Sequence, residues 1–222
     1  MRLLLFDIDG TLVRCGRQVR ELFSAALVEA FGTCGDLDAY DFSGKTDPQI
    51  VRELMTAAGL DDDAIAAGLP RMRDTYLSRL EAELSMVQVL PGVLDALAAV
   101  RSRDDLAVGL VTGNWRRGAS AKLGRVGLDD FRLGAFGDDG EDRACLPPVA
   151  LERAREVFGH DFAPADALII GDSVEDVRCA RASGVPVVAV ASGWTSAERL
   201  RDAGADRIAP SLDAALPWLL DR

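Results

Sequence analysis

Short apolar runs alternate with helical segments through the second half of this chain, and few folds can accommodate such a series. After Pro91 the pattern predicts strands at 106–111, 133–136, 167–170 and 187–190, and helices at 93–103, 118–126, 148–158 and 174–182. An earlier run, Leu3 to Phe6, predicts one more strand, buried on both faces. Strands that alternate with helices form βαβ units on a parallel sheet. The sequence therefore predicts an α/β protein with a doubly wound sheet.

The stretch that follows the first strand interrupts this series with helices alone. Helices are expected at 19–31, 48–58 and 64–84, and nothing between them is typical of a buried strand. We interpret the stretch as an inserted α-helical cap domain. The expected division is a core made of residues 1–13 and 88–222, with a cap made of residues 14–87.

Charge and composition limit the partners of this protein. The net charge is -11, from 25 Lys+Arg against 36 Asp+Glu, without a basic cluster, so neither nucleic acid nor an anionic membrane is an expected partner. A small phosphorylated metabolite needs only one local anion site. The four cysteines form no C-x-x-C pair and there is one histidine, which excludes a thiolate or imidazole zinc cluster. The apolar N-terminal run is too short for a signal peptide, so we expect a cytoplasmic protein, monomeric or homodimeric.

Polar residues follow three of the predicted strands, where ligands bind in a doubly wound sheet. These segments are Asp7-Ile8-Asp9-Gly10-Thr11-Leu12, Thr112-Gly113-Asn114 and Gly171-Asp172-Ser173-Val174-Glu175-Asp176. Folding would gather four aspartates, which repel one another unless a cation is present. Carboxylate oxygens without histidine or cysteine suit magnesium. The sequence therefore predicts a Mg²⁺ site formed by Asp7, Asp9, Asp172 and Asp176.

The same segments contain groups suited to phosphoryl chemistry. Of Asp7 and Asp9, one can attack phosphorus while the other protonates the leaving oxygen and later activates water. Gly10 permits a turn with close backbone approach. Thr112 offers a hydroxyl and a backbone N–H at an expected helix start, where a phosphoryl group binds well. We therefore expect Gly10, Thr112, Gly113 and Asn114 to contact the substrate.

The three segments resemble motifs I, II and IV of the haloacid dehalogenase superfamily, over nearly the whole chain and in the phosphoglycolate-phosphatase-like subgroup with an inserted helical cap. The resemblance implies a Rossmann-like core and a phosphoaspartyl intermediate. It makes Asp7 the nucleophile and a metal ligand, and Asp9 the general acid and base whose backbone carbonyl also binds the metal. It makes Thr112 a phosphate donor and Asp172 a metal ligand. Asp176 would lie near the metal, bound directly or through water.

One departure from the family pattern concerns motif III, which normally supplies a lysine between motifs II and IV. The only lysines here are Lys45 and Lys122, and Lys122, close after motif II, is expected to be a solvated surface charge. Arg143, which ends the acidic segment 137–143, is the best placed substitute and a candidate catalytic residue. The alternative is a salt-bridged loop arginine. The acidic segment itself is expected to be a solvated loop rather than a second metal site.

The cap contains one stretch, Ser43 to Pro48, that combines a turn, a cation and a helix start. Thr46 or Asp47 is expected to cap the helix, with Pro48 in its first turn. Lys45 is expected to reach the substrate when the cap closes.

These observations predict a magnesium-dependent phosphatase acting on a small-molecule phosphomonoester. Asp9 argues against a dehalogenase, since a halide leaving group needs no acid. A phosphomutase is an alternative, although related mutases use a cap histidine that is absent here. A phosphonate hydrolase would use Lys45 as a Schiff base. A non-catalytic phosphate- or metal-binding member of the fold is the remaining alternative, although it has no need of the Asp7 and Asp9 pair.

Overall fold

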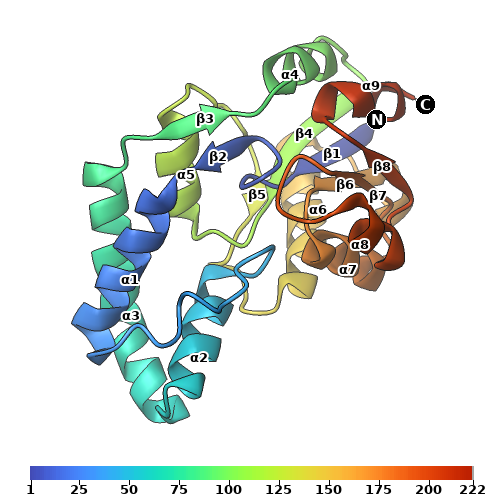
Figure 1. The fold of residues 1–222 in the computed structure, drawn as a ribbon. Helices are drawn as coiled ribbons and strands as arrows, with labels where there is room; N and C mark the ends of the chain where they lie inside the picture. Colours follow the sequence, from blue (N-terminus) through green and yellow to red (C-terminus); the bar gives the residue numbers. More distant parts are fainter. Residues whose placement is uncertain (222) are drawn as a thin grey trace.

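The computed structural model describes residues 1–221 and shows an α/β core beside a helical lobe (Figure 1). The main sheet has the strand order β5-β4-β1-β6-β7-β8, and every neighbouring pair is parallel. Its strands are β1 (Arg2–Phe6), β4 (Leu106–Val111), β5 (Gly134–Ala135), β6 (Ala167–Gly171), β7 (Val187–Val190) and β8 (Arg207–Ala209). Numbered along the chain within this sheet, the order is 3-2-1-4-5-6, the Rossmann arrangement. The predicted Rossmann-like, doubly wound fold class is confirmed.

Helices cover both faces of the sheet because the central strands are apolar on both sides. Leu4 and Phe6 of β1 pack against helices α4, α5 and α9, whereas Leu3 and Leu5 pack against α6, α7 and α8. The first layer consists of α4 (Val93–Arg101), α5 (Arg116–Gly124) and α9 (Leu212–Leu220). The second layer consists of α6 (Leu146–Phe158), α7 (Val174–Ser183) and α8 (Ala197–Asp202). Within residues 1–221, none of the helices is both long and apolar enough to cross a membrane.

The helical lobe contains α1 (Arg17–Phe31), α2 (Asp47–Ala57) and α3 (Asp62–Glu83), which pack around a hydrophobic cluster of their own. The chain enters and leaves this lobe through β2 (Val13–Cys15) and β3 (Val87–Val89), which pair as an antiparallel ribbon (Figure 1). Residues 14 and 88 face each other in this ribbon. We propose the division into core and cap at these positions; the last residue of the expected core, 222, lies outside the described residues.

The part of the chain after β7 contains three elements that the sequence pattern did not predict, namely α8, β8 and α9. The helix α8 has six residues and β8 has three, which is too short for a clear periodicity. Helix α9 contains Pro217, a residue that normally argues against a helix interior. Tertiary packing stabilises α9 in spite of this proline, since its residues Leu212, Ala215 and Leu219 are buried in the core.

Candidate active site

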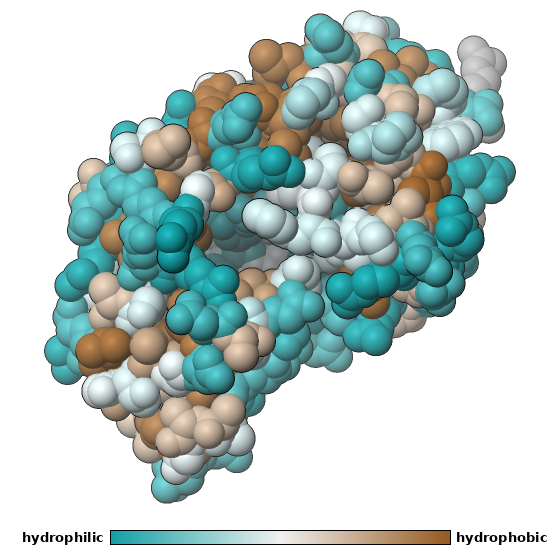
Figure 2. Space-filling view, in the orientation of Figure 1, coloured by the Kyte–Doolittle hydropathy of each residue, from teal (hydrophilic) through white to brown (hydrophobic). Residues whose placement is uncertain are grey.

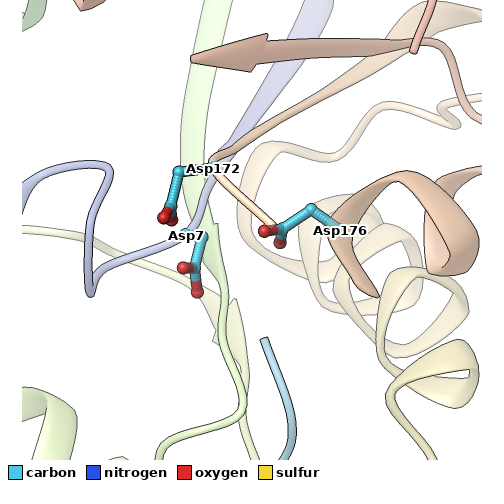
Figure 3. A group of neighbouring side chains, drawn as sticks. All are labelled: Asp7, Asp172 and Asp176. Atoms are coloured by element: carbon cyan, nitrogen blue, oxygen red, sulfur yellow. The ribbon is translucent and has the colours of Figure 1, made fainter. Parts of the chain in front are cut away.

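Three carboxylates converge at the carboxyl ends of β1 and β6 (Figure 3). Phe6 lies opposite Ile170 in the sheet, and the backbone N–H of Asp7 donates to Ile170 O at 2.8 Å. Asp7 and Asp172 therefore follow neighbouring strands, and Asp176 reaches the same place from the first turn of α7. Ligand oxygens of these three residues lie within 4.8 Å of one another. The strand order changes direction at this point, which is where a doubly wound sheet binds ligands.

The electrostatics of this cluster favour a bound cation. Burial raises the pKa of Asp7 to about 7; the guanidinium of Arg143 opposes this rise, and the charges of Asp176 and Asp9 add to it. Burial also raises the pKa of Asp172 well above its ordinary value, and the charges of Asp7 and Asp176 add to this. Three buried oxygen ligands without histidine or cysteine form a donor set that fits Mg²⁺.

Two glycines allow the backbone to approach Asp172 closely. Gly10 has a φ of +85°, and a Cβ built on it would lie 2.3 Å from Asp172 Oδ2. A Cβ on Gly193 would lie 1.6 Å from the same oxygen. Thr11 Oγ1 donates to Asp172 Oδ1 at 3.2 Å. The turn expected at Gly10 therefore packs against a metal-site carboxylate, and Thr11 is a site residue that the sequence analysis did not single out.

Arg143 lies inside the same cluster. Its side chain is 4% exposed, one Nη atom lies 3.0 Å from Asp7 Oδ1, and the same atom also contacts Asp176 Oδ1. The other Nη donates to Gly44 O at 2.7 Å. Arg143 is therefore a salt-bridged residue, but its partners are the site carboxylates and not surface acids. Its position is compatible with a replacement for the motif III lysine.

Both oxygens of Asp176 already have protein partners. Oδ2 accepts hydrogen bonds from Ser173 N at 3.0 Å and from Ser173 Oγ at 2.6 Å, and Oδ1 contacts Arg143. The first pair belongs to a capping box at the start of α7. Asp176 is therefore held in a fixed orientation by the helix that it helps to begin.

Asp9 is separate from the carboxylate cluster and interacts with a different cation. Its Oδ2 lies 2.6 Å from Lys122 Nζ and accepts from Asn114 Nδ2 at 2.7 Å. Lys122 is 3% exposed, so the expectation of a solvated surface lysine was wrong. It lies on the face of α5 that also buries Ala119 and Leu123, and its charge is compensated by Asp9. The i, i+3, i+4 spacing of positions 119, 122 and 123 was the signal that could have revealed this.

The motif II segment, Thr112-Gly113-Asn114, differs from the prediction in the role of the Thr112 N–H. The N–H of Thr112 donates to Ala135 O at 3.0 Å, so it is not available to a phosphoryl group. The reason is that α5 begins only at Arg116, while Thr112 still pairs with β5. The Thr112 hydroxyl remains a candidate donor, and its Oγ1 accepts from Asn114 Nδ2 at 2.9 Å.

The cap loop before α2 packs directly on the core beside this segment. Thr46 caps α2 by accepting from Gln49 N at 3.2 Å, and Pro48 lies in the first turn, as predicted. The Thr46 hydroxyl donates to Glu141 O at 2.6 Å, and Asp47 N donates to Gly113 O at 2.8 Å. A Cβ on Gly113 would lie 2.1 Å from Lys45 O, so only glycine allows this approach.

Asp47 and Trp115 connect the cap and the core. The Asp47 carboxylate accepts from Trp115 N at 2.8 Å, and burial raises the pKa of Asp47 to about 7. The Trp115 ring packs against Tyr76 of α3, with ring centroids 6.1 Å apart. Arg116 and Arg117, which follow, are exposed.

Lys45 lies at the cavity wall, but its ammonium group is bound within the cap. Nζ is 2.5 Å from Glu53 Oε2 and 3.2 Å from Tyr40 Oη. The structure therefore brings Lys45 to the cavity without placing its charge among the aspartates.

A cavity of about 810 Å³ lies between the cap and the core. Figure 2 shows the surface hollowed where the helical lobe meets the sheet. Its floor contains Asp7, Asp9, Thr112, Gly113, Asn114, Lys122, Arg143 and Asp172. Its cap wall contains Phe23, Phe42, Lys45, Ile50 and Tyr76, and three arginines, Arg14, Arg17 and Arg20, also line it.

Comparison with known proteins identifies the family. The model of the haloacid dehalogenase-like hydrolases matches residues 1–184. The chain belongs to this family. It is 30% identical to a phosphoglycolate phosphatase of Cupriavidus necator over 98% of this chain and 92% of that protein. A phosphoglycolate phosphatase of Rhodospirillum rubrum is also 30% identical, over 97% of this chain and 90% of the relative.

Solved structures agree with the fold. A predicted phosphatase from Clostridium acetobutylicum superposes with a TM-score of 0.75, covering 99% of this chain and 98% of that one at 21% identity. At this identity the likeness shows the fold alone. Together, the family and its curated relatives make this protein a haloacid dehalogenase-type phosphoric monoester hydrolase.

Proposed function

We propose that this phosphatase hydrolyses a small-molecule phosphomonoester with the help of Mg²⁺ and through a phosphoaspartyl intermediate on Asp7. The observation that carries the proposal is the contrast between Asp7 and Asp9. Asp7 is buried beside Arg143, whereas the Asp9 side chain is 41% exposed and interacts with Lys122. Two carboxylates in such different surroundings suit two different roles.

In the proposed reaction, a carboxylate oxygen of Asp7 attacks phosphorus. The Asp7 O–P bond forms while the P–O bond to the alcohol breaks, and Asp9 gives its proton to the departing oxygen. Asp9 then takes a proton from the water that attacks the phosphoaspartate, which releases phosphate and restores both side chains. The Thr112 hydroxyl would donate to the phosphoryl group, and Arg143 would offset its charge.

The metal would be held by Asp7 and Asp172, by the backbone carbonyl of Asp9, and by Asp176 either directly or through water. Bound there, Mg²⁺ would neutralise the carboxylates and the phosphoryl oxygens. The buried oxygen donor set supports this assignment.

The curated relatives indicate which substrate to test first. Those from Cupriavidus necator and Rhodospirillum rubrum are named phosphoglycolate phosphatases. We propose phosphoglycolate as the first candidate, with sugar phosphates, nucleotides and phosphorylated amino acids as competitors. We also propose a cytoplasmic location, since the four cysteines are free.

The direct test is phosphate release from a panel of phosphomonoesters that includes phosphoglycolate and 4-nitrophenyl phosphate. We expect release by the wild-type protein with Mg²⁺, and none by Asp7→Asn. If the wild-type protein binds Mg²⁺ and releases no phosphate from any ester, a binding protein, a mutase or a phosphonate hydrolase replaces the phosphatase.

Removal of the metal should abolish activity and also lower stability. Mg²⁺ at about 100 times its Kd should stabilise the folded state by about 2.7 kcal/mol, because it binds only that state. The measurement is the Tm with Mg²⁺ and with a chelator. The matched control is Asp172→Asn, which should lose most of the Mg²⁺-dependent rise in Tm. Equal Tm values for the wild-type protein under both conditions would contradict the assigned site.

Lys45→Ala should change substrate preference with little effect on the Asp7 chemistry. Lys45 lines the cavity but lies outside the carboxylate cluster. We therefore compare esters whose alcohol part is anionic with esters whose alcohol part is neutral, and expect the ratio of their kcat/KM values to fall roughly tenfold. Glu53→Gln is the matched control, since it frees the ammonium group from its acidic partner and should not lower this ratio. An unchanged preference in Lys45→Ala would count against a substrate contact.

A further inference from the structure

The buried lysine of α5 has no role in the reaction described above. Lys122 is one of two lysines in the chain, and its ammonium group lies at the floor of the cavity. Burial of a cation is costly unless partners compensate it. Its two hydrogen-bonding partners both belong to site segments, Asp9 Oδ2 at 2.6 Å and Asn114 Oδ1 at 2.6 Å.

We propose that Lys122 is a positioning residue that orients Asp9 for proton transfer and Thr112 for phosphate donation. This inference rests on the proposed phosphatase function. It also gives the two cations of the site different partners, since Arg143 contacts Asp7 and Lys122 contacts Asp9.

One oxygen of the Asp9 carboxylate is held by two donors. Lys122 Nζ and Asn114 Nδ2 both interact with Oδ2, at 2.6 and 2.7 Å. Two donors on one oxygen fix the rotation of the carboxylate, so we assign the proton transfer to Oδ1. A general acid must be held within hydrogen-bond reach of the leaving oxygen, and a small misplacement costs rate.

The amide of Asn114 lies between Lys122, Asp9 and Thr112. An ammonium group only donates, so the Asn114 atom that faces it must be the amide oxygen. The amide NH₂ therefore faces Asp9 Oδ2 and Thr112 Oγ1, at 2.7 and 2.9 Å. Since Thr112 Oγ1 accepts this hydrogen bond, its own hydrogen must point elsewhere and can be donated to a phosphoryl oxygen. Lys122 thus determines the direction of a donor that it does not touch.

The test compares two esters in Lys122→Met, which keeps an unbranched side chain one atom shorter and removes its charge. An alkyl phosphate needs a proton on its leaving oxygen, whereas 4-nitrophenolate leaves without one. We expect kcat for the alkyl ester to fall about 100-fold, with KM nearly unchanged. Nitrophenol release in a single turnover should fall by no more than about threefold, because that step needs no acid and loses only the fixed orientation of the Thr112 hydroxyl. The Tm should fall by only a few degrees, since Asp9, which loses its cation, has a side chain that is 41% exposed and can be solvated.

Two further variants separate positioning from a general effect. Arg125→Met removes an exposed cation from the end of the same helix and should leave both rates unchanged. When Asp9→Asn is already present, adding Lys122→Met should lower the rate little further, because both changes act through the same carboxylate. An unchanged alkyl-ester kcat in Lys122→Met, or an equal loss of rate for both esters, would overturn the proposal. If the wild-type protein itself hydrolyses no ester, the proposed function fails instead.

Discussion

Asp7→Asn is expected to abolish phosphate release and at the same time to stabilise the metal-free protein. An amide cannot form the phosphoaspartate, so kcat should fall below about 10⁻³ of the wild-type value. The stability gain follows from the cluster, in which Asp7, Asp172 and Asp176 place three carboxylates within 4.8 Å. Asparagine removes one charge from this repulsion and keeps the shape of the side chain, while Arg143 retains its ion pair with Asp176.

The pH dependence of this gain has a definite sign. Burial raises the pKa of Asp7 from 3.8 to about 7, so between these values the folded protein holds a proton that the unfolded chain releases. The stability of the metal-free wild-type protein therefore falls as the pH rises through this range. Asp7→Asn lacks this contribution, so its advantage in Tm should widen from pH 4 to pH 8. An advantage of about 1 kcal/mol corresponds to roughly 2–4 °C for a protein of this size.

The measurement is thermal unfolding of both proteins in chelator across the pH range, with phosphate release measured in Mg²⁺. Asp104→Asn is the control, because Asp104 is exposed. A Tm advantage that does not change with pH would show that Asp7 is not the group responsible. Wild-type turnover by Asp7→Asn would remove it as the nucleophile.

Arg143→Ala should lower both activity and stability by large amounts. The guanidinium contacts Asp7 and Asp176 at 4% exposure, and its removal leaves both carboxylates buried without their cation. Breaking a buried ion pair from one side costs about 3–5 kcal/mol of folding free energy. Loss of a donor that offsets phosphoryl charge should lower kcat about 10²- to 10³-fold. Mg²⁺ should restore part of the stability, because it replaces a positive charge in the cluster.

Two variants keep this experiment interpretable if Arg143→Ala is poorly folded. Arg143→Lys retains the charge, so it should fold and keep more activity than the alanine variant. Arg153→Ala removes an arginine that binds Asp139 in the same acidic segment, with its side chain 31% exposed, and should retain turnover. Full activity of a folded Arg143→Ala protein would refute its role in place of the motif III lysine.

Local pattern was sufficient for most of the core. The strands predicted at 106–111 and 187–190 have the same bounds as β4 and β7, because a strand buried on both faces is a continuous apolar run.

The acidic segment at 137–143 was expected to be a solvated loop, yet its acids have partners. Asp139 binds Arg153, and Glu141 binds Arg52 of α2.

The sequence by itself determined which strands end in Asp7, Thr112 and Asp172. It also determined that these residues meet at one edge of a sheet. Periodicity and motif spacing are properties of neighbouring residues, so they can be read along the chain. The tertiary structure alone decided which cation interacts with which carboxylate. Lys122 and Asp9 are 113 positions apart, and Arg143 and Asp7 are 136 apart. Such ion pairs form only when the folded sheet brings distant segments together. Each buried charge then needs a partner of opposite charge, because an unpaired buried charge is costly.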